Sequence, residues 1–230
     1  MALSVDTIYQ RVLAILNKEQ RGFVTPEEFN LFANQAQLDI FEQYFYDINQ
    51  FGRMHGNDTE YSDMVNNLNE KISLFETEAT LTRTGNYFVL PANLYRIGTV
   101  KVGAIEAERV NQNEYLYINA SPLAKPTNAR PVYTKSDSGI KAYGTAEYST
   151  TGNINCHYVK KPAQVAWGYT TVSGSAQYNA STTTNFELHD SEETDLVIEI
   201  LALCGLALKD SSVYQTAVGE KVRDTNEEKS

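Results

Sequence analysis

The residues of this sequence that could carry out chemistry are few, and their spacing fits no common site. The candidate metal ligands and nucleophiles are His55, His157, His189, Cys156 and Cys204. No two of them stand at the short spacings of a zinc site, and the neighbours Cys156 and His157 would point to opposite faces of a strand. Neither common glycine-rich phosphate loop occurs. We therefore expect no metal, no cofactor and no catalytic constellation.

The adjacent charged pairs have explanations other than catalysis. Glu27–Glu28 and Glu192–Glu193 stand at predicted helix starts, where the helix dipole stabilises negative charge, and this explains them better than an acid–base pair does. Lys160–Lys161 could contact a phosphate, but such a pair more often ends a strand in solvent. The sequence thus predicts a protein that is not an enzyme.

Composition excludes further classes of protein. The chain has 230 residues and a net charge of −10, which argues against binding along a nucleic-acid backbone. No apolar run reaches the length of a membrane span, and the N-terminus lacks the pattern of a signal peptide. Two distant cysteines are typical of reduced structural thiols, so we expect a soluble protein of the cytosol. The 15 tyrosines suit either protein interfaces or a core whose bulky residues keep one polar end.

Residues 1–78 show the period of helices. Thr25, Pro26 and Glu28 form the signature of a capping box, so a helix is predicted to begin there. One face of this helix is aromatic and apolar and is expected to be core. The other face is rich in neutral amides, which can bond across a partner surface at less desolvation cost than charges.

Residues 79–189 change to the period of strands. Hairpins are predicted for TLTRTGNYFVL and around Ser136–Gly139, with further strands at TVKVG and before Pro162. Residues 172–184 are rich in Ser, Thr, Asn and Gly and are predicted to be a long flexible loop.

Residues 190–230 return to the helical period. Asp190 or Ser191 can cap a helix that is apolar on most of its circumference and therefore buried. Residues 1–78 and 190–230 carry net charges of −8 and −6, whereas residues 79–189 carry +4. The expected fold class is α+β: an acidic helical lobe made from both chain ends, with an inserted antiparallel β domain at 79–189.

Two segments resemble a known family. RVLAILNKEQRGFVTPEEFNLFANQAQLDIFEQYF, at residues 11–45, resembles the N-terminal segment of ring (structural) proteins of crAss-like and related tailed phages. Residues 86–100, together with helical ends that flank a β insert, are similar to head-to-tail adaptor proteins. In those proteins Leu-Pro, a small polar residue and Leu-Tyr recur where a hairpin leads into the sheet, and the matching residues here are Leu90, Pro91, Asn93, Leu94 and Tyr95. The β insert is longer here than in that family.

The resemblance implies a non-enzymatic virion protein of the head-tail connector, or neck. Such adaptors form homo-oligomeric rings of about twelve copies beneath the portal, where they extend the DNA channel and dock the tail. The implied partners are further copies of the chain, the portal protein and other neck or tail ring proteins. DNA is expected to pass through the channel without sequence-specific binding, and no membrane is involved. The implied location is the virion, with the host cytoplasm during assembly.

Two sets of contact residues are predicted. The amide-rich face of the capped helix is assigned to the subunit interface, at Asn30, Asn34, Gln37, Gln43 and Tyr44. The resemblance also implies that residues 211–230 reach the portal, and there the predicted contacts are Tyr214, Lys221 and Arg223. The alternative is a carbohydrate- or cell-surface-binding module, in which a Tyr-rich β domain is displayed on a helical support.

Overall fold

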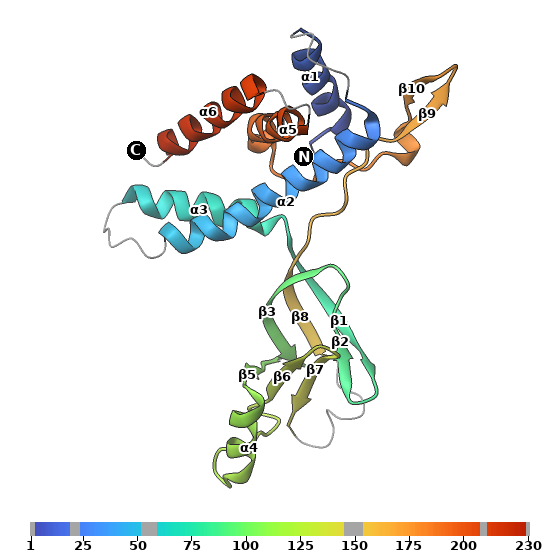
Figure 1. Ribbon diagram of the computed structural model, residues 1–230. Helices are drawn as coiled ribbons and strands as arrows, with labels where there is room; N and C mark the ends of the chain where they lie inside the picture. The colour runs from blue at the N-terminus through green and yellow to red at the C-terminus, as the bar shows by residue number, and fades with distance from the viewer. Residues whose placement is uncertain (1–2, 19–23, 52–58, 145–153, 208–210, 229–230) are drawn as a thin grey trace. The chain divides into compact units, whose positions relative to one another are not determined.

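The computed structural model describes residues 3–18, 24–51, 59–144, 154–207 and 211–228 (Figure 1). Over these residues the fold is mixed α and β, with six α-helices and a large, mostly antiparallel sheet. The chain divides into two compact units, one formed by Met1–Leu74 with Pro162–Ser230 and the other by Phe75–Lys161. We call them the helical unit and the β unit.

The helical unit is built around one buried helix. Its helices are α1 (Val5–Lys18), α2 (Pro26–Phe51), α3 (Thr59–Ser73), α5 (Glu193–Ala207) and α6 (Ser211–Glu228). Helix α5 contacts α1, α2 and α6, and Leu196, Ile200 and Cys204 are completely buried along it. The predicted burial of this helix is thus confirmed. None of the described helices is both long enough and apolar enough to cross a membrane.

The starts of α2 and α5 differ in how well the sequence predicted them. The Thr25 amide donates to the Glu28 carboxylate at 2.9 Å, and the Glu28 amide donates to the Thr25 hydroxyl at 3.3 Å, which confirms the capping box. Before α5, a 3₁₀ turn at Asp190–Glu192 (η3) intervenes. The imidazole of His189 accepts a hydrogen bond from the Ser191 amide, so His189 caps this turn rather than Asp190 or Ser191.

The β unit contains one eight-stranded sheet in the order β4-β3-β8-β1-β2-β7-β6-β5. Its strands are β1 (Glu76–Thr84), β2 (Tyr87–Val89), β3 (Leu94–Val102), β4 (Ile105–Glu106), β5 (Glu108–Arg109), β6 (Val132–Ser136), β7 (Gly139–Tyr143) and β8 (Ile154–Lys160). The two predicted hairpins are confirmed as β1–β2 and β6–β7. A short helix, α4 (Gln112–Ala120), joins β5 to β6 and was not predicted.

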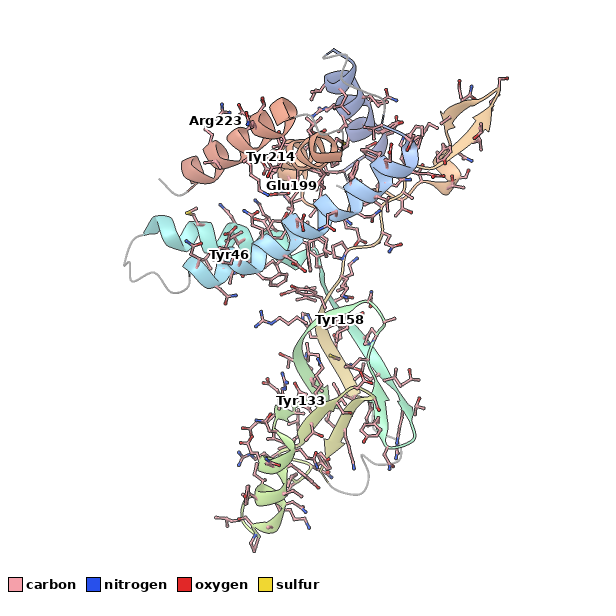
Figure 2. All side chains as sticks on the ribbon, viewed as in Figure 1. Tyr46, Tyr133, Tyr158, Glu199, Tyr214 and Arg223 are labelled. Carbon is pink, nitrogen blue, oxygen red and sulfur yellow. The ribbon has the colours of Figure 1, made fainter. Side chains whose placement is uncertain are left out.

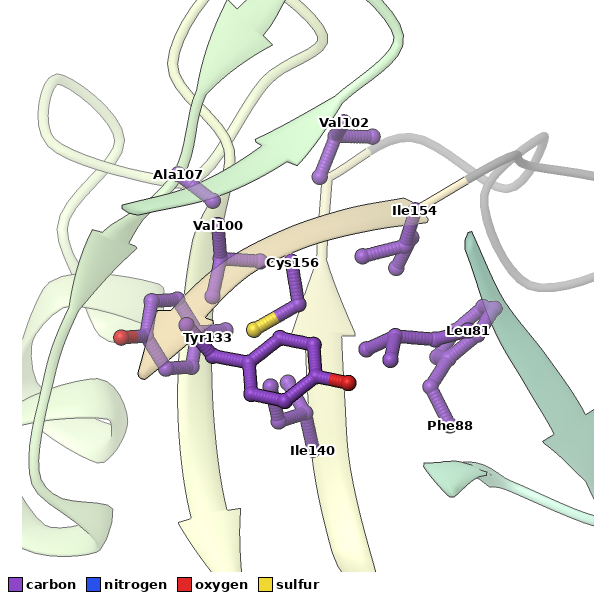
Figure 3. Packing of buried hydrophobic residues seen from close by; sticks show 10 residues of the cluster. Leu81, Phe88, Val100, Val102, Ala107, Tyr133, Ile140, Ile154 and Cys156 are labelled. Carbon is purple, nitrogen blue, oxygen red and sulfur yellow. The ribbon is translucent and has the colours of Figure 1, made fainter. Parts of the chain in front are cut away.

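The two halves of this sheet share one core (Figure 3). Leu81, Val100 and Ile154 come from β1, β3 and β8, whereas Phe88 and Ile140 come from β2 and β7. These side chains pack in a single cluster, so the sheet curves enough for both halves to face it. A β unit with its own core has the means to fold as a domain.

The boundaries of the units differ from the predicted ones. Residues 75–78 belong to the β unit, with 76–78 in β1, and residues 162–189 belong to the helical unit. The predicted flexible loop at 172–184 is wrong. Strands β9 (Tyr169–Val172) and β10 (Ser175–Tyr178) form a hairpin, followed by a 3₁₀ turn, η2 (Ala180–Thr182). Ser173 and Gly174 both have positive φ, as a two-residue type I′ turn requires.

Candidate functional site

The amide face of α2 holds the segment that follows β8. Asn30, Asn34 and Gln37 lie about one turn apart on this face. Asn34 donates to the Val165 carbonyl and accepts from the Val165 amide, both at 2.8 Å. Asn30 makes the same pair of bonds with Trp167, at 3.4 and 2.7 Å. Each side chain thus makes the two backbone hydrogen bonds that a residue of a neighbouring strand would otherwise make.

Gln37 completes this row by joining two segments. Its amide donates to the Ala163 carbonyl at 2.8 Å, and its oxygen accepts from the Glu187 amide at 3.1 Å. Only 3% of Gln37 is exposed. The amides of Asn30, Asn34 and Gln37 are therefore used within the chain. The subunit interface assigned to this face stays a prediction.

Trp167 anchors the base of the β9–β10 hairpin on the helices. Its indole N–H donates to Asp6 at 2.9 Å, and its ring lies 4.3 Å from that of Tyr9. The rings of Tyr169 and Tyr178 are each 5.9 Å from Trp167. The hairpin itself extends past the helices of its unit, and nearly all its residues are exposed (Figure 1).

A groove of about 280 Å³ opens in the helical unit between α2, α3, α5 and α6. We call it the groove, and it is lined by Ile40, Gln43, Tyr44, Asp47, Met64, Asn67, Leu68, Lys71, Glu192, Asp195, Ile198, Glu199 and Lys221. The lining combines apolar side chains with four carboxylates and two lysines, which we call the charged lining. Three of the predicted contact residues, Gln43, Tyr44 and Lys221, meet here although the sequence assigned them to two different surfaces.

Ion pairs hold the charged lining in place. Lys71 lies 2.5 Å from the buried carboxylate of Glu192, and its ammonium is 5.7 Å from the centre of the Tyr44 ring. Lys221 pairs with Glu199 at 2.6 Å. The hydroxyl of Tyr44 is buried and interacts with Glu192, but it makes no hydrogen bond of good geometry with the residues that the structure describes. Burial, and then the negative charges of Glu192 and Asp195, raise the pKa of Tyr44 well above its usual range, so this hydroxyl stays protonated.

The other predicted portal contacts lie along α6 (Figure 2). Tyr214 is exposed. Arg223 pairs with Glu220, one turn earlier, at 2.6 Å. A solvent-exposed pair of this kind contributes little to stability. Tyr214 and Arg223 both lie at the surface of the helical unit.

The β unit presents an exposed apolar surface that the sequence did not reveal. Leu116 and Tyr117 of α4 are 57% and 79% exposed, and Leu123 just after it is 99% exposed. We call these three residues the apolar tip. Tyr115 holds α4 in place by stacking on Tyr143, with ring centres 3.7 Å apart. The only signal for this helix was the capping box of Asn111 and Glu114, which the structure shows.

A second hollow, of about 390 Å³, lies beside α4 in the β unit. Its lining includes three cations, Arg109, Lys135 and Lys141, and no carboxylate. Over the residues that the structure describes, no group of three or more His, Cys, Asp or Glu side chains could hold a metal ion.

Both cysteines are buried free thiols. Burial raises the pKa of Cys156, and burial followed by the charge of Glu28 raises that of Cys204 to about 12. Because the thiolate is the nucleophile, neither cysteine is suited to reaction in the folded protein.

A comparison with protein-family models finds no family that matches this chain, and a search of curated proteins finds no similar sequence. The resemblance to head-to-tail adaptors therefore stays a prediction.

Proposed function

We propose that this protein is a non-enzymatic structural component of the virion neck, a ring protein beneath the portal that extends the DNA channel and docks the tail. The observation that carries the proposal is the division of the chain: helices from both ends share one unit, and the β unit is a single insertion between them. This arrangement supports an adaptor-like helix bundle with an inserted antiparallel β domain.

The charges of the two units support the same proposal. The helical unit has 9 basic and 22 acidic residues, and the β unit has 10 basic and 7 acidic. An acidic helical unit can border a channel through which DNA passes without binding, because like charges repel. Opposite charges on two units of one chain also orient neighbouring copies as they meet.

Exposed apolar side chains on both units support self-assembly. Tyr46 is exposed on α2, and the apolar tip is exposed on the β unit. Apolar residues that gather at a protein surface commonly mark interaction sites. A closed ring of identical subunits needs two different complementary surfaces on each subunit, and each unit offers a candidate.

The proposed partners are further copies of the chain, the portal and the neighbouring neck or tail rings. The portal contact is placed on α6, where Tyr214 and Arg223 lie at the surface. The protein would be in the host cytoplasm during assembly and in the virion afterwards.

The mass of the purified protein in solution tests this function, alone and mixed with the portal protein of the same virus. We expect a ring of about twelve copies, either preformed or assembled on the portal, because heterologous contacts close at a fixed number. A chain that stays a monomer in both samples would contradict the proposal.

A carbohydrate- or cell-surface-binding module is the second candidate. The observation that favours it is the β9–β10 hairpin, where Tyr178 is 44% exposed beside the ring of Trp167. A module of this kind should bind a glycan surface as a monomer, and Tyr178→Ala should abolish that binding. No retention on a panel of glycans would remove this candidate.

A further inference from the structure

We propose that the apolar tip of one copy docks in the groove of a second copy. This inference rests on the proposed function, because a ring of identical subunits requires two surfaces on each chain that match one another. The apolar tip lies on the β unit, and the groove lies on the helical unit, so one pair of surfaces would link copies head to tail.

The groove has the size and lining to receive side chains. Its volume of about 280 Å³ lies just below the range of about 300–1,000 Å³ that small-molecule sites occupy. Ile40, Leu68 and Ile198 give it apolar surface on three different helices. Apolar side chains of a partner that fill such a hollow are the usual anchors of a protein interface.

The apolar tip supplies the matching side chains. Leu123 is 99% exposed and Tyr117 is 79% exposed, so both side chains can enter a partner without any change in the fold of the β unit. Tyr117 also carries a hydroxyl, which can form hydrogen bonds with the polar side chains that line the groove of the second copy. Leu116, the third member, is also exposed.

Charge favours the same pairing. Four carboxylates and two lysines line the groove, so its lining carries a net negative charge. Lys125, two residues after Leu123, is exposed beside the apolar tip. The β unit as a whole carries a net charge of +3, against −13 on the helical unit. These charges would guide the docking and make it weaker at high salt.

Disulfide formation between two variants, each with one added cysteine, tests the contact directly. Leu123→Cys places a thiol on the apolar tip, and Asn67→Cys places one at the groove, where Asn67 is exposed. The native thiols are buried and stay protonated, so they need not be removed. Mixing the two variants allows a mixed disulfide only between different copies. The matched control replaces Asn67→Cys with Leu31→Cys, an exposed α2 position outside the groove.

We expect the mixed dimer of Leu123→Cys with Asn67→Cys to form about 10-fold faster than the control pair, because docking raises the effective thiol concentration. The experiment is run on the protein alone and with the portal protein of the same virus. In parallel, sedimentation of Leu123→Asp should show self-association weakened about 10-fold, since a buried leucine side chain contributes at least this much. Leu31→Asp should leave association within about 3-fold of the wild type.

The outcomes separate this inference from the proposed function. If oligomers form but the two cysteine pairs link at equal rates, or if Leu123→Asp associates normally, the proposed docking contact is wrong. The proposed ring is then not contradicted. If the protein stays a monomer with and without the portal protein, both the ring and the docking fail. A free peptide that spans residues 112–125 and binds the wild-type protein, but not a variant with Ile198→Asp in the groove, would confirm the contact from the groove side.

Discussion

At the scale of single residues, the amides of α2 act as partners for backbone groups. Asn34 satisfies both the amide and the carbonyl of Val165, and Asn30 does the same for Trp167. A helix surface normally offers no such partners, because its own backbone bonds are internal. Side-chain amides supply one donor and one acceptor each, which is what one residue of an extended segment needs.

Asn34→Asp tests this role. The substitution keeps the shape and the acceptor for the Val165 amide but turns the donor toward the Val165 carbonyl into a second acceptor. We expect the free energy of unfolding of the helical unit to fall by about 1–3 kcal/mol, measured by urea denaturation, because a buried carbonyl then lacks its bond. The matched control is Gln35→Glu on the next, exposed residue, which bonds only Asp39 within α2. It should cost less than about 0.5 kcal/mol, and an equal cost for both would contradict the role.

At the scale of elements, tight turns decide where the strands pair. Gly85 has a φ of 63° in the turn between β1 and β2, as the first position of a type II′ turn requires. Gly139 starts β7 with a φ of 126°, and there a second constraint applies. A Cβ on Gly139 would lie only 2.2 Å from the Phe88 carbonyl oxygen of β2. Gly139 therefore allows β2 and β7 to come together, which joins the two halves of the sheet.

Alanine substitutions separate these two constraints. Gly85→Ala meets nothing within 4 Å, so it should cost only the strain of positive φ, about 1–2 kcal/mol. Gly139→Ala should cost at least about 1 kcal/mol more, because two backbones must also move apart. Thermal unfolding followed by far-ultraviolet circular dichroism compares the two variants in the same β unit. Equal midpoints would show that the close approach of β2 and β7 is not needed.

At the scale of the whole molecule, the β unit is an insertion with paired ends. Its first strand, β1, lies antiparallel to its last, β8, and Glu76 faces Val159 across the ladder. The chain thus enters and leaves the β unit through neighbouring strands. An insertion of this kind has its own core, so we expect it to fold without the helices.

We expect residues 75–161 to fold when expressed alone, with a single cooperative thermal transition and a dispersed amide spectrum by nuclear magnetic resonance. The matched control is the fragment 79–189, which follows the boundaries expected from the sequence. It should aggregate, because it loses the pairing of residues 76–78 with β8 and exposes Val165, Trp167 and Phe186, which are buried in the intact chain. A well-folded 79–189 fragment would contradict the division of the chain.

The sequence by itself determined the local features of this protein. The capping box at Thr25, the hairpins at Gly85 and Ser136–Gly139, and the burial of α5 all follow from residues a few positions apart. Such signals act within one turn of helix or one pair of strands, so they can be read without knowing the fold. The β9–β10 hairpin was missed because a turn of Ser173 and Gly174 between polar strands looks like a loop.

Only the tertiary structure decided what the surfaces do. The amides of α2 were predicted to bond across a surface between subunits, and the structure shows that Gln37 bonds residues 126 and 150 positions away in the same chain. The groove likewise combines four helices, and the apolar tip is exposed only because β5 and β6 leave α4 outside the core. Contacts at such separations depend on how whole elements pack. The partner of a side-chain amide or a leucine therefore cannot be predicted from its residue type alone.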